Sequence, residues 1–295
     1  MQFYLIDPAS DLGEAHPISE SEFTTLQLAR SRLSAALSLE EAYNLLLANH
    51  KDLEVEAMTI AIDRMTGISG SEYQDFFEVR SSLNRRALNL LSAARLYLDQ
   101  FQQRLNDAGA DPSTAKAEQR LAYESSFEYR LMEALRNHVQ HVGLAVHSVS
   151  FSSRRLSLAE GSQIEIEVTA ETLRSALSQD PKFKKSVLAE CPDKVSVLGA
   201  ARAYVGGISS IHSTVRELIE PLVADARSEF KAAISKHTAT SSKVGLMAIA
   251  QDGQNPTEEF PVFLAWDDVR LRMVARNSII ANLARRSFSS KTNLR

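Results

Sequence analysis

The sequence predicts a mainly helical protein with a minor share of β-strands. Long segments repeat apolar residues every three to four positions, and a few short segments alternate apolar and polar residues instead. The chain has 295 residues, of which 44% are hydrophobic and 24% charged, as in a globular protein of one large domain or two. We divide it into a helical region, 1–150, and an accessory region, 151–295, which pack separately or as one unit. No Gly/Pro-rich linker marks that boundary.

The N-terminal segment begins with a short apolar run and continues into helical periodicity. Residues 1–8 predict a short strand. Residues 19–50 predict a helix that Ser19 opens, with Glu22 three positions later as the partner in a capping box. Residues 52–66 predict a second amphipathic helix, which ends at the glycines that follow it.

The next two helices carry the main functional motif of the chain. Residues 72–108 predict one long helix that ends at Gly109 and an Asp-Pro pair. Its apolar side carries Phe76, Leu83, Leu90, Ala94 and Phe101. A further helical region follows over about 115–142. We expect the two helices to run antiparallel, with their 84–105 and 127–142 parts packed on each other.

Alternation of apolar and polar residues indicates two strand pairs in the accessory region. The first pair is a hairpin joined across 154–162, and the second consists of 243–250 and 261–265 around a turn. The apolar positions of the hairpin are Val146, Val149, Phe151, Ile164, Ile166 and Val168. These strands are the minor β content of the predicted fold.

Helical periodicity fills most of the remaining accessory region. Residues 172–178 predict a short helix, and 193–237 predict a long one that Pro221 reshapes. The pair Gly206-Gly207 indicates either a break in this helix or a close contact with another helix. Residues 267–288 predict a final amphipathic helix, followed by a polar, basic tail.

Composition and charge exclude several classes of protein. The lone Cys191 excludes an internal disulfide framework and a cysteine-based zinc site, and it favours a reducing, cytoplasmic setting. No apolar run is long enough to span a membrane, and the N-terminus does not read as a signal peptide. The net charge of −4 means that any nucleic-acid contact must come from a local basic surface.

The most informative stretch lies inside the helical segment 127–142. One side of this helix carries an apolar stripe of Leu131, Met132, Leu135, Val139 and Val142. The other side carries Arg130, Glu133, Asn137 and His141 at spacings of three or four, with Arg136 beside Glu133. This arrangement gathers a carboxylate, guanidinium groups, an amide and an imidazole opposite the core.

Arg136, Asn137 and His141 form the pattern Arg-Asn-x3-His, which resembles the signature of HEPN domains. These are small helical domains of prokaryotic toxins, anti-phage systems and some eukaryotic RNA-processing proteins. The likeness covers residues 75–150, including a helix at 84–99 similar to the one that packs beside the motif helix in that family. It implies a HEPN-like helical bundle with additional β-hairpins and C-terminal helices. Some members carry a tyrosine two residues after the histidine as a target for nucleotidylation, a variant that Gly143 argues against.

The resemblance implies a metal-independent endoribonuclease that needs no cofactor and works as a homodimer. RNA supplies its own 2′-hydroxyl nucleophile, so the protein must move protons and neutralise phosphate charge. Histidine as a residue type suits proton transfer near neutral pH, which favours His141 for this role, while Arg136 suits phosphate binding. Asn137 completes the catalytic set. The family role is that of a toxin or a phage-defence or stress effector, so we expect RNA, a second copy, and an antitoxin or other protein as partners.

Glu133, Arg130 and His138 are predicted to support the catalytic residues. The competing interpretation is a solvated helix face in which Glu133 pairs with the arginines, on a silent scaffold that binds a partner protein or RNA. His138 lies between the two faces and is either a neighbour of the site or a packed edge residue. An ion shared by His138 and His141 is a further alternative, but no third ligand at metal spacing supports it. We assign no role to His147.

Overall fold

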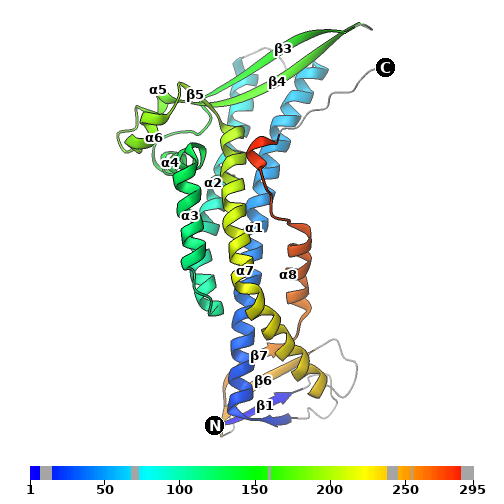
Figure 1. The fold of residues 1–295 in the computed structure, drawn as a ribbon. Helices are drawn as coiled ribbons and strands as arrows, with labels where there is room; N and C mark the ends of the chain where they lie inside the picture. The colour runs from blue at the N-terminus through cyan, green and yellow to red at the C-terminus, as the bar shows by residue number, and fades with distance from the viewer. Residues whose placement is uncertain (7–14, 68–72, 159–160, 238–244, 254, 287–295) are drawn as a thin grey trace. The chain divides into compact units, whose positions relative to one another are not determined.

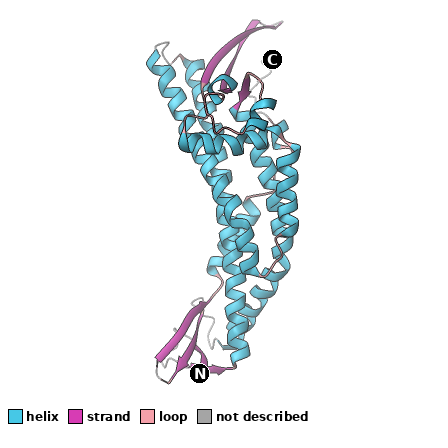
Figure 2. Ribbon diagram, turned by 90° about the vertical axis from the view of Figure 1, so that its left-hand side faces the viewer, coloured by secondary structure: helices cyan, strands magenta, loops and turns pink. Residues whose placement is uncertain are grey.

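The computed structural model describes residues 1–6, 15–67, 73–158, 161–237, 245–253 and 255–286. Over these residues the protein is mainly helical, with two small antiparallel sheets. Figure 1 shows the course of the chain, and Figure 2 separates helices from strands by colour. The predicted fold class, mainly α with minor strands, is confirmed at this level.

Tertiary contacts divide the chain into two compact units, each assembled from three stretches of sequence. The first unit comprises residues 1–44, 99–116 and 212–278. The second comprises residues 45–98, 117–211 and 279–295. The regions expected from the sequence, 1–150 and 151–295, do not coincide with these two units. The expected division stays a prediction.

A four-stranded antiparallel sheet belongs to the first unit, in the order β2-β1-β6-β7. Its strands are β1 (Gln2–Ile6), β2 (Ala15–Ile18), β6 (Leu246–Asp252) and β7 (Asn255–Val262). The N-terminal strand is confirmed. The strand expected at 261–265 begins earlier, because the left-handed turn at Gly253 (φ 63°) returns the chain by Asn255. Residue 243, where its partner was expected to begin, lies outside the described residues.

Helix α1 (Glu20–Thr66) is one continuous helix, so the two helices predicted at 19–50 and 52–66 are wrong as separate elements. The polar run around residue 51 contains no Gly or Pro, and it does not interrupt the backbone ladder. The capping box is confirmed: the Ser19 N–H donates to Glu22 (2.9 Å) and the Glu22 N–H donates to Ser19 Oγ (3.1 Å). Gly67 ends the helix with φ 71°.

Aromatic packing joins the sheet of the first unit to α1. The ring of Phe23 lies 5.0 Å from that of Phe3 in β1 and 5.2 Å from that of Phe260 in β7, measured between centroids. All three come from different elements, and Phe23 and Phe260 are buried. Burial of aromatic surface of this size stabilises the contact between helix and sheet.

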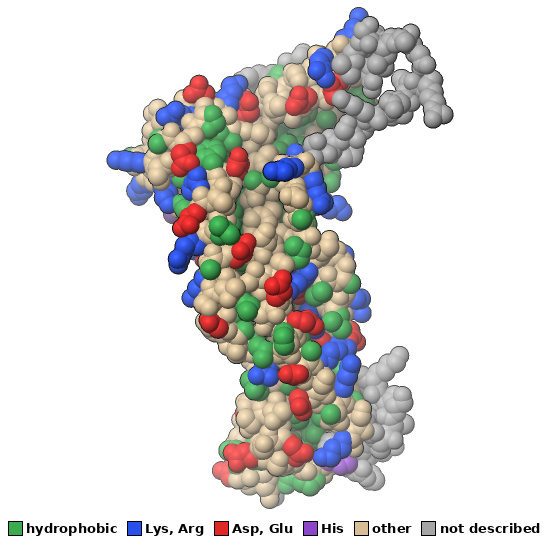
Figure 3. Space-filling view, viewed as in Figure 1, with side chains coloured by type: hydrophobic (Ala, Val, Ile, Leu, Met, Phe, Trp, Pro, Cys, Tyr) green, Lys and Arg blue, Asp and Glu red, His purple; other side chains and the backbone are tan. Residues whose placement is uncertain are grey.

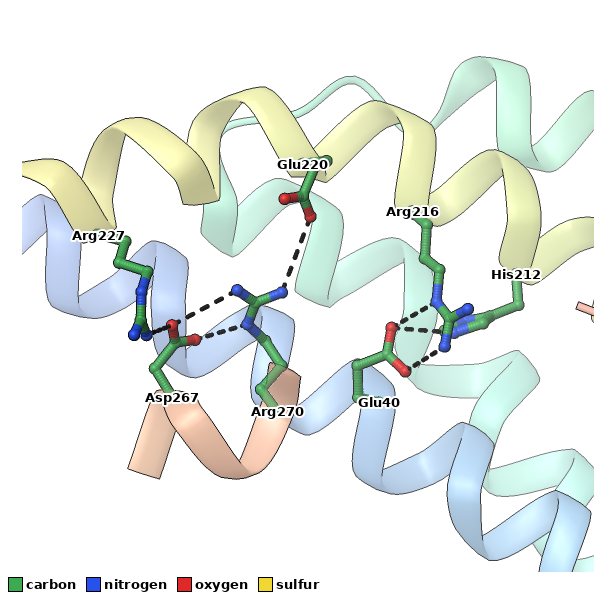
Figure 4. A network of polar contacts seen from close by, with 7 residues as sticks. All are labelled: Glu40, His212, Arg216, Glu220, Arg227, Asp267 and Arg270. Carbon is green, nitrogen blue, oxygen red and sulfur yellow. Dashed lines mark hydrogen bonds and ion pairs between the residues drawn. The ribbon is translucent and has the colours of Figure 1, made fainter. Parts of the chain in front are cut away.

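A buried ionic network crosses the helices of the first unit (Figure 4). The Glu40 carboxylate accepts two hydrogen bonds from Arg216, each 2.7 Å, and lies 3.2 Å from His212 Nε2. Burial disfavours the charged carboxylate, yet the bonds from Arg216 and His212 lower the pKa of Glu40 to about 2. In a second cluster, the Asp267 carboxylate forms ion pairs with Arg227 and Arg270. The network fixes the register of α7 (Val197–His237) against α1 and α8 (Ala265–Arg276).

The second unit contains a three-stranded antiparallel sheet and several helices. Its strands, in the order β3-β4-β5, are β3 (Ser148–Leu158), β4 (Gly161–Leu173) and β5 (Lys194–Ser196). The predicted hairpin is confirmed, with Phe151 opposite Val168 and Val149 opposite Ala170. The connection predicted across 154–162 is wrong in length, because 154–158 and 161–162 belong to the paired strands. The short helix predicted at 172–178 is reduced to α5 (Arg174–Leu177), since Thr172 and Leu173 remain in β4. Strand β5 and helix α6 (Lys185–Glu190) were not predicted.

The long helix predicted at 72–108 is confirmed as α2 (Tyr73–Ala108), which ends before Gly109 (φ 82°). The motif region predicted as one helix over 115–142 consists of two, α3 (Ser113–Ser125) and α4 (Phe127–His141). The chain breaks at Ser126, whose extended backbone (φ −124°, ψ 120°) opens the second helix. The expectation of one long helix there is wrong, because an N-cap serine competes with helix continuation.

Helix α7 runs through Gly206-Gly207 without a break, and Pro221 lies inside it. The glycine pair marks a close contact instead, which was the other interpretation offered by the sequence. A Cβ added at Gly207 would lie only 2.8 Å from Cδ2 of Tyr129. The final helix expected over 267–288 is wrong in length: α8 ends at Arg276, and a short 3-10 turn, η1 (Leu283–Arg285), follows. Residues 287 and 288 lie outside the described residues.

In the part of the chain that the structure describes, none of the helices combines the length and the apolar character that a membrane span requires.

Candidate functional site

Helix α4 presents the motif, and its own sequence explains why it forms. Ser126 Oγ accepts a hydrogen bond from the Tyr129 N–H (3.1 Å), which satisfies one free donor of the first turn. The buried side of the helix consists of Tyr129, Leu131, Met132, Ala134, Leu135 and His138. Val142, expected in the apolar stripe, lies just past the helix end and is 53% exposed. The buried side therefore packs α4 against the rest of the second unit, and the opposite side of the helix can contact a ligand.

Arg130 has a structural role at the junction of α3 and α4. Its Nη1 donates to the backbone oxygens of Tyr123 and Glu124, both at 2.9 Å, so it caps the free carbonyls at the end of α3. Its Nη2 donates to Glu190 at 2.5 Å. Arg130 is thus directed to α3 and α6, away from the ion pair with Glu133 that the sequence pattern indicated.

Glu133 also bonds to a different helix. It accepts a hydrogen bond from the hydroxyl of Tyr204, a fully buried residue of α7. Burial, reinforced by the neighbouring charge of Glu133, raises the pKa of the Tyr204 hydroxyl well above its usual range. Tyr204 therefore remains protonated at neutral pH and donates to the carboxylate. This bond ties α4 to α7 beside the motif.

The three residues predicted to be catalytic occupy the last half of α4. Asn137 and His141 are exposed and lie four positions apart, so their side chains are neighbours on one helix face. Arg136 is half-buried, and its Nη1 donates to Asn137 Oδ1 at 2.6 Å. The cation is thereby held on the side that carries Asn137 and His141. In the described structure, no hydrogen bond joins His141 to Arg136 or Asn137. The three groups therefore lie on one side of the helix without forming a bonded triad.

His138 is buried and packed, which answers the question that the sequence left open. Its Nδ1 lies 2.9 Å from Asp180 Oδ2, and both side chains are about 4% exposed. The hydrogen bond with His138 is the main cause that lowers the pKa of the Asp180 carboxyl. On the other edge of the ring, a Cβ added at Gly143 would lie 2.8 Å from Nε2. Gly143 thus allows the chain to close over this imidazole after α4 ends.

His147 lies close to His138, with 6.0 Å between ring centroids. Its Nδ1 accepts from the Leu173 N–H at 3.2 Å and contacts Thr172 Oγ1 at 3.0 Å. Since Nδ1 accepts from a backbone donor, the neutral ring carries its proton on Nε2. Burial lowers the pKa of this imidazole, and the charges of His138 and Arg80 lower it further. His147 therefore acts as a neutral link between α4 and the sheet.

A metal ion shared by His138 and His141 finds no support in this geometry. Both ring nitrogens of His138 face protein atoms, whereas His141 points to solvent. Among the described residues, no group of three or more His, Cys, Asp or Glu side chains is arranged to hold a metal ion.

A pocket in the second unit does not include the motif. It has a volume of about 590 Å³ and is lined by small residues of α7 together with Lys194, Glu128 and the segment around Leu283. Arg136, Asn137 and His141 are not among its lining residues. The three motif residues therefore lie outside this pocket, and Asn137 and His141 are exposed on α4.

Four residues that shape the surroundings of the motif escaped the sequence analysis. Asp180 and Phe183 contact His138, while Tyr204 contacts Glu133 and Lys184 contacts Tyr123. Asp180 and Phe183 belong to the run Asp180-Pro181-Lys182-Phe183-Lys184-Lys185, whose basic character was visible in the sequence. Tyr204 carried no signal of its own, because a tyrosine inside an apolar helix is an ordinary core residue.

Comparison with known proteins adds no relative: neither a protein-family model, nor a curated protein, nor a solved structure gives a significant match to this chain.

Proposed function

We propose that this protein is a metal-independent endoribonuclease of HEPN type. Arg136, Asn137 and His141 carry the activity, with Glu133, Arg130 and His138 holding the helix that presents them. We further propose the role of a toxin or of an effector in phage defence or stress. These proposals rest on the resemblance of the motif, and the geometry of α4 supports the chemistry.

One observation carries the proposal: the hydrogen bond of 2.6 Å between Arg136 Nη1 and Asn137 Oδ1. His141 follows Arg136 by five positions, so on a regular α-helix their side chains point about 140° apart, at about 100° per residue. The contact with Asn137 brings the guanidinium toward the face that His141 shares. A phosphate bound by the remaining donors of Arg136 therefore lies on the side of the exposed imidazole.

The reaction follows from the groups that RNA and α4 provide. His141 accepts the proton of the 2′-hydroxyl, and O2′ attacks the adjacent phosphorus. The O2′–P bond forms while the P–O5′ bond breaks, and O5′ takes up a proton. Arg136 neutralises charge on the non-bridging oxygens throughout. The products are a 2′,3′-cyclic phosphate and a free 5′-hydroxyl.

A second acid is required for the leaving oxygen, because the same imidazole cannot accept and donate in one concerted step. A second copy of the chain would supply it as another His141. We therefore propose a homodimer in which two motif helices face one RNA strand, as the family resemblance implies.

The test is cleavage of single-stranded RNA by purified protein in excess EDTA, with analysis of the product ends. We expect cleavage that EDTA does not slow, and fragments that end in 2′,3′-cyclic phosphate. DNA of the same sequence should remain intact because it lacks the 2′-hydroxyl. Complete absence of RNA cleavage under these conditions, with folded protein, would overturn the proposal.

A non-catalytic scaffold is the second candidate, and one observation favours it. Val142 and Leu144 directly follow the motif helix and are 53% and 49% exposed. Two exposed apolar side chains this close in sequence can form part of a protein-binding surface. If the protein binds a partner through this surface and cleaves no RNA, the scaffold replaces the enzyme.

A further inference from the structure

The segment Pro181–Lys185, here called the lysine segment, presents three cations beside the motif helix. Lys182, Lys184 and Lys185 are exposed, whereas Phe183 between them is 5% exposed. We propose that these three lysines bind the phosphate backbone of single-stranded RNA and lead it to the motif. This inference rests on the proposed function, because it names the element that holds the substrate of that site.

The lysine segment packs against α4 through His138, a residue within the span of the motif. Asp180, the residue before it, is the partner of buried His138, and Asp180 Oδ1 also accepts from the Lys182 N–H at 2.9 Å. The ring of Phe183 meets the ring of His138 edge-on, with 6.0 Å between centroids. His138 precedes His141 by three positions, so the two residues lie in adjacent places on the helix. The lysines therefore stand next to the turn of α4 that carries the exposed imidazole.

Lys184 is held in place by an aromatic residue of α3. It donates to the hydroxyl of Tyr123, and its Nζ lies 4.7 Å from the centroid of that ring. A ring contact and one hydrogen bond leave further ammonium donors for a ligand. Because the side chain is already ordered, less conformational entropy is lost when a phosphate binds.

Three carboxylates of the elements near the lysine segment are engaged by other residues. Asp180 faces His138, Glu190 pairs with Arg130 at 2.5 Å, and Glu133 accepts from Tyr204. Neither Lys182 nor Lys185 forms an ion pair with any residue that the structure describes. Their charge is thus available to a partner. Figure 3 shows several basic side chains projecting from this part of the molecule, around α5 and α6.

A polyanion with regularly spaced single charges fits this surface better than a single small anion does. The three flexible ammonium groups are exposed, and each can contact a different phosphate. The net charge of the chain is −4, so a local cluster is required for any polyanion to bind. Single-stranded RNA is the polyanion that the neighbouring motif would cleave, and its flexible backbone can follow the segment toward α4.

The experiment measures RNA binding in the His141→Ala background, which keeps the RNA uncut. The test variant is K182Q/K184Q/K185Q, and the matched control is K51Q/K116Q/K231Q, which removes three exposed lysines elsewhere. Fluorescence anisotropy of a short labelled single-stranded RNA is followed across about 50 to 200 mM salt. Circular dichroism of each protein verifies that it is folded.

We expect the test variant to bind at least about tenfold more weakly, and the control to bind like the background protein. The salt dependence should become shallower by about 0.7 for each lysine that contacts a phosphate, hence by about 2 for all three. Equal losses in test and control would overturn the inference, as would binding that polyglutamate displaces as readily as RNA does. In the latter case the surface binds acidic polymers in general.

Cleavage by the same lysine variants, with His141 intact, separates this inference from the proposed function. If the parent cleaves RNA and the test triple binds and cleaves equally well, the lysine segment has no role while the enzyme stands. If the lysines are needed for binding but the parent never cleaves, the RNA surface stands and the endoribonuclease does not.

Discussion

His138 and His141 lie three residues apart on one helix, yet their environments give them opposite roles. His138 is enclosed by Asp180, Phe183 and Gly143, whereas His141 faces solvent at the helix end. The first ring is committed to protein contacts, and only the second is free to exchange protons with a ligand. The spacing of the two histidines in sequence could not distinguish them, because the partner Asp180 is supplied from 42 residues further along the chain.

Removal of a single motif side chain should abolish RNA cleavage and leave the fold intact. We expect His141→Ala and Arg136→Ala to lose on the order of a hundredfold or more in rate, since one transfers protons and the other neutralises phosphate charge. Asn137→Ala should lose less, because its amide only orients Arg136. Single-turnover cleavage assays measure these losses, and thermal melting verifies the fold. Parental rates in both His141→Ala and Arg136→Ala would contradict the assignment.

Replacement of His138 should lower the stability of the fold more than replacement of His141 does. His138→Ala leaves the Asp180 carboxylate buried without its main hydrogen-bond donor and removes the ring that Phe183 contacts. We expect a fall of several degrees in Tm, against a change within about 1 °C for the exposed His141→Ala. Differential scanning calorimetry of the two variants makes the comparison. A larger fall for His141→Ala would show that the burial assigned to the two rings is reversed.

At the scale of elements, signals that depend on neighbouring residues predicted well, and signals that depend on distant contacts did not. The capping box of Ser19 and Glu22, the end of α2 at Gly109 and the β3–β4 hairpin all formed as the sequence indicated. Each depends on backbone conformation or alternation within a few residues. The break at Ser126 was not predicted. Ser126 Oγ caps the start of α4, and Arg130, which caps the end of α3, also pairs with Glu190, 60 positions further along the chain.

The candidate site shows the same limit. Arg136, Asn137 and His141 could be placed on one helix from their spacing, and two of them are exposed as a ligand site requires. The partner of Glu133 could not be predicted, because it is Tyr204 of α7, which donates a hydrogen bond to the carboxylate. A contact between residues 71 positions apart leaves no trace in helical periodicity.

The glycine pair of α7 provides a matched test of close packing. A Cβ at Gly207 would lie 2.8 Å from Tyr129, a fixed buried ring, whereas a Cβ at Gly206 would meet Leu283 at an ordinary 3.5 Å. Alanine at either position gains about 1 kcal/mol of helix propensity. We therefore expect Gly206→Ala to be neutral or stabilising, and Gly207→Ala to destabilise by about 1–3 kcal/mol through overpacking. Urea denaturation measures the free energy of unfolding of both variants. Equal changes in Gly206→Ala and Gly207→Ala would contradict the close contact of Gly207 with Tyr129.

For the molecule as a whole, the stability of the first unit should depend on pH through Glu40. Its pKa is lowered to about 2 from an ordinary 4.5, so its contribution is fully present above about pH 4.5 and is lost as pH falls toward 2. The shift corresponds to about 3 kcal/mol. Glu40→Gln should lower the free energy of unfolding by about this amount at neutral pH and flatten its fall below pH 4.5.

The control for the Glu40 variant is Glu41→Gln, which changes an exposed carboxylate on the same helix. We expect it to change the free energy of unfolding by less than about 0.5 kcal/mol at every pH. Denaturant titrations between pH 2 and pH 7, the range set by the shifted and ordinary states of Glu40, compare the three proteins. Identical pH profiles for Glu40→Gln and Glu41→Gln would contradict the role of the buried network.

Assembly is the last property that the proposed chemistry requires of the whole molecule. One exposed imidazole at the end of α4 supplies one proton-transfer group, whereas cleavage needs a base and an acid. Val142 and Leu144, beside that imidazole, are exposed apolar residues that a second copy would cover. We therefore expect a homodimer in which Val142→Glu and Leu144→Glu separate the subunits and reduce cleavage together, since each charge would be buried at the interface. Light scattering at micromolar concentration measures the mass. A parent that is monomeric and fully active would show that one α4 suffices, and the second acid must then come from another group on the same chain.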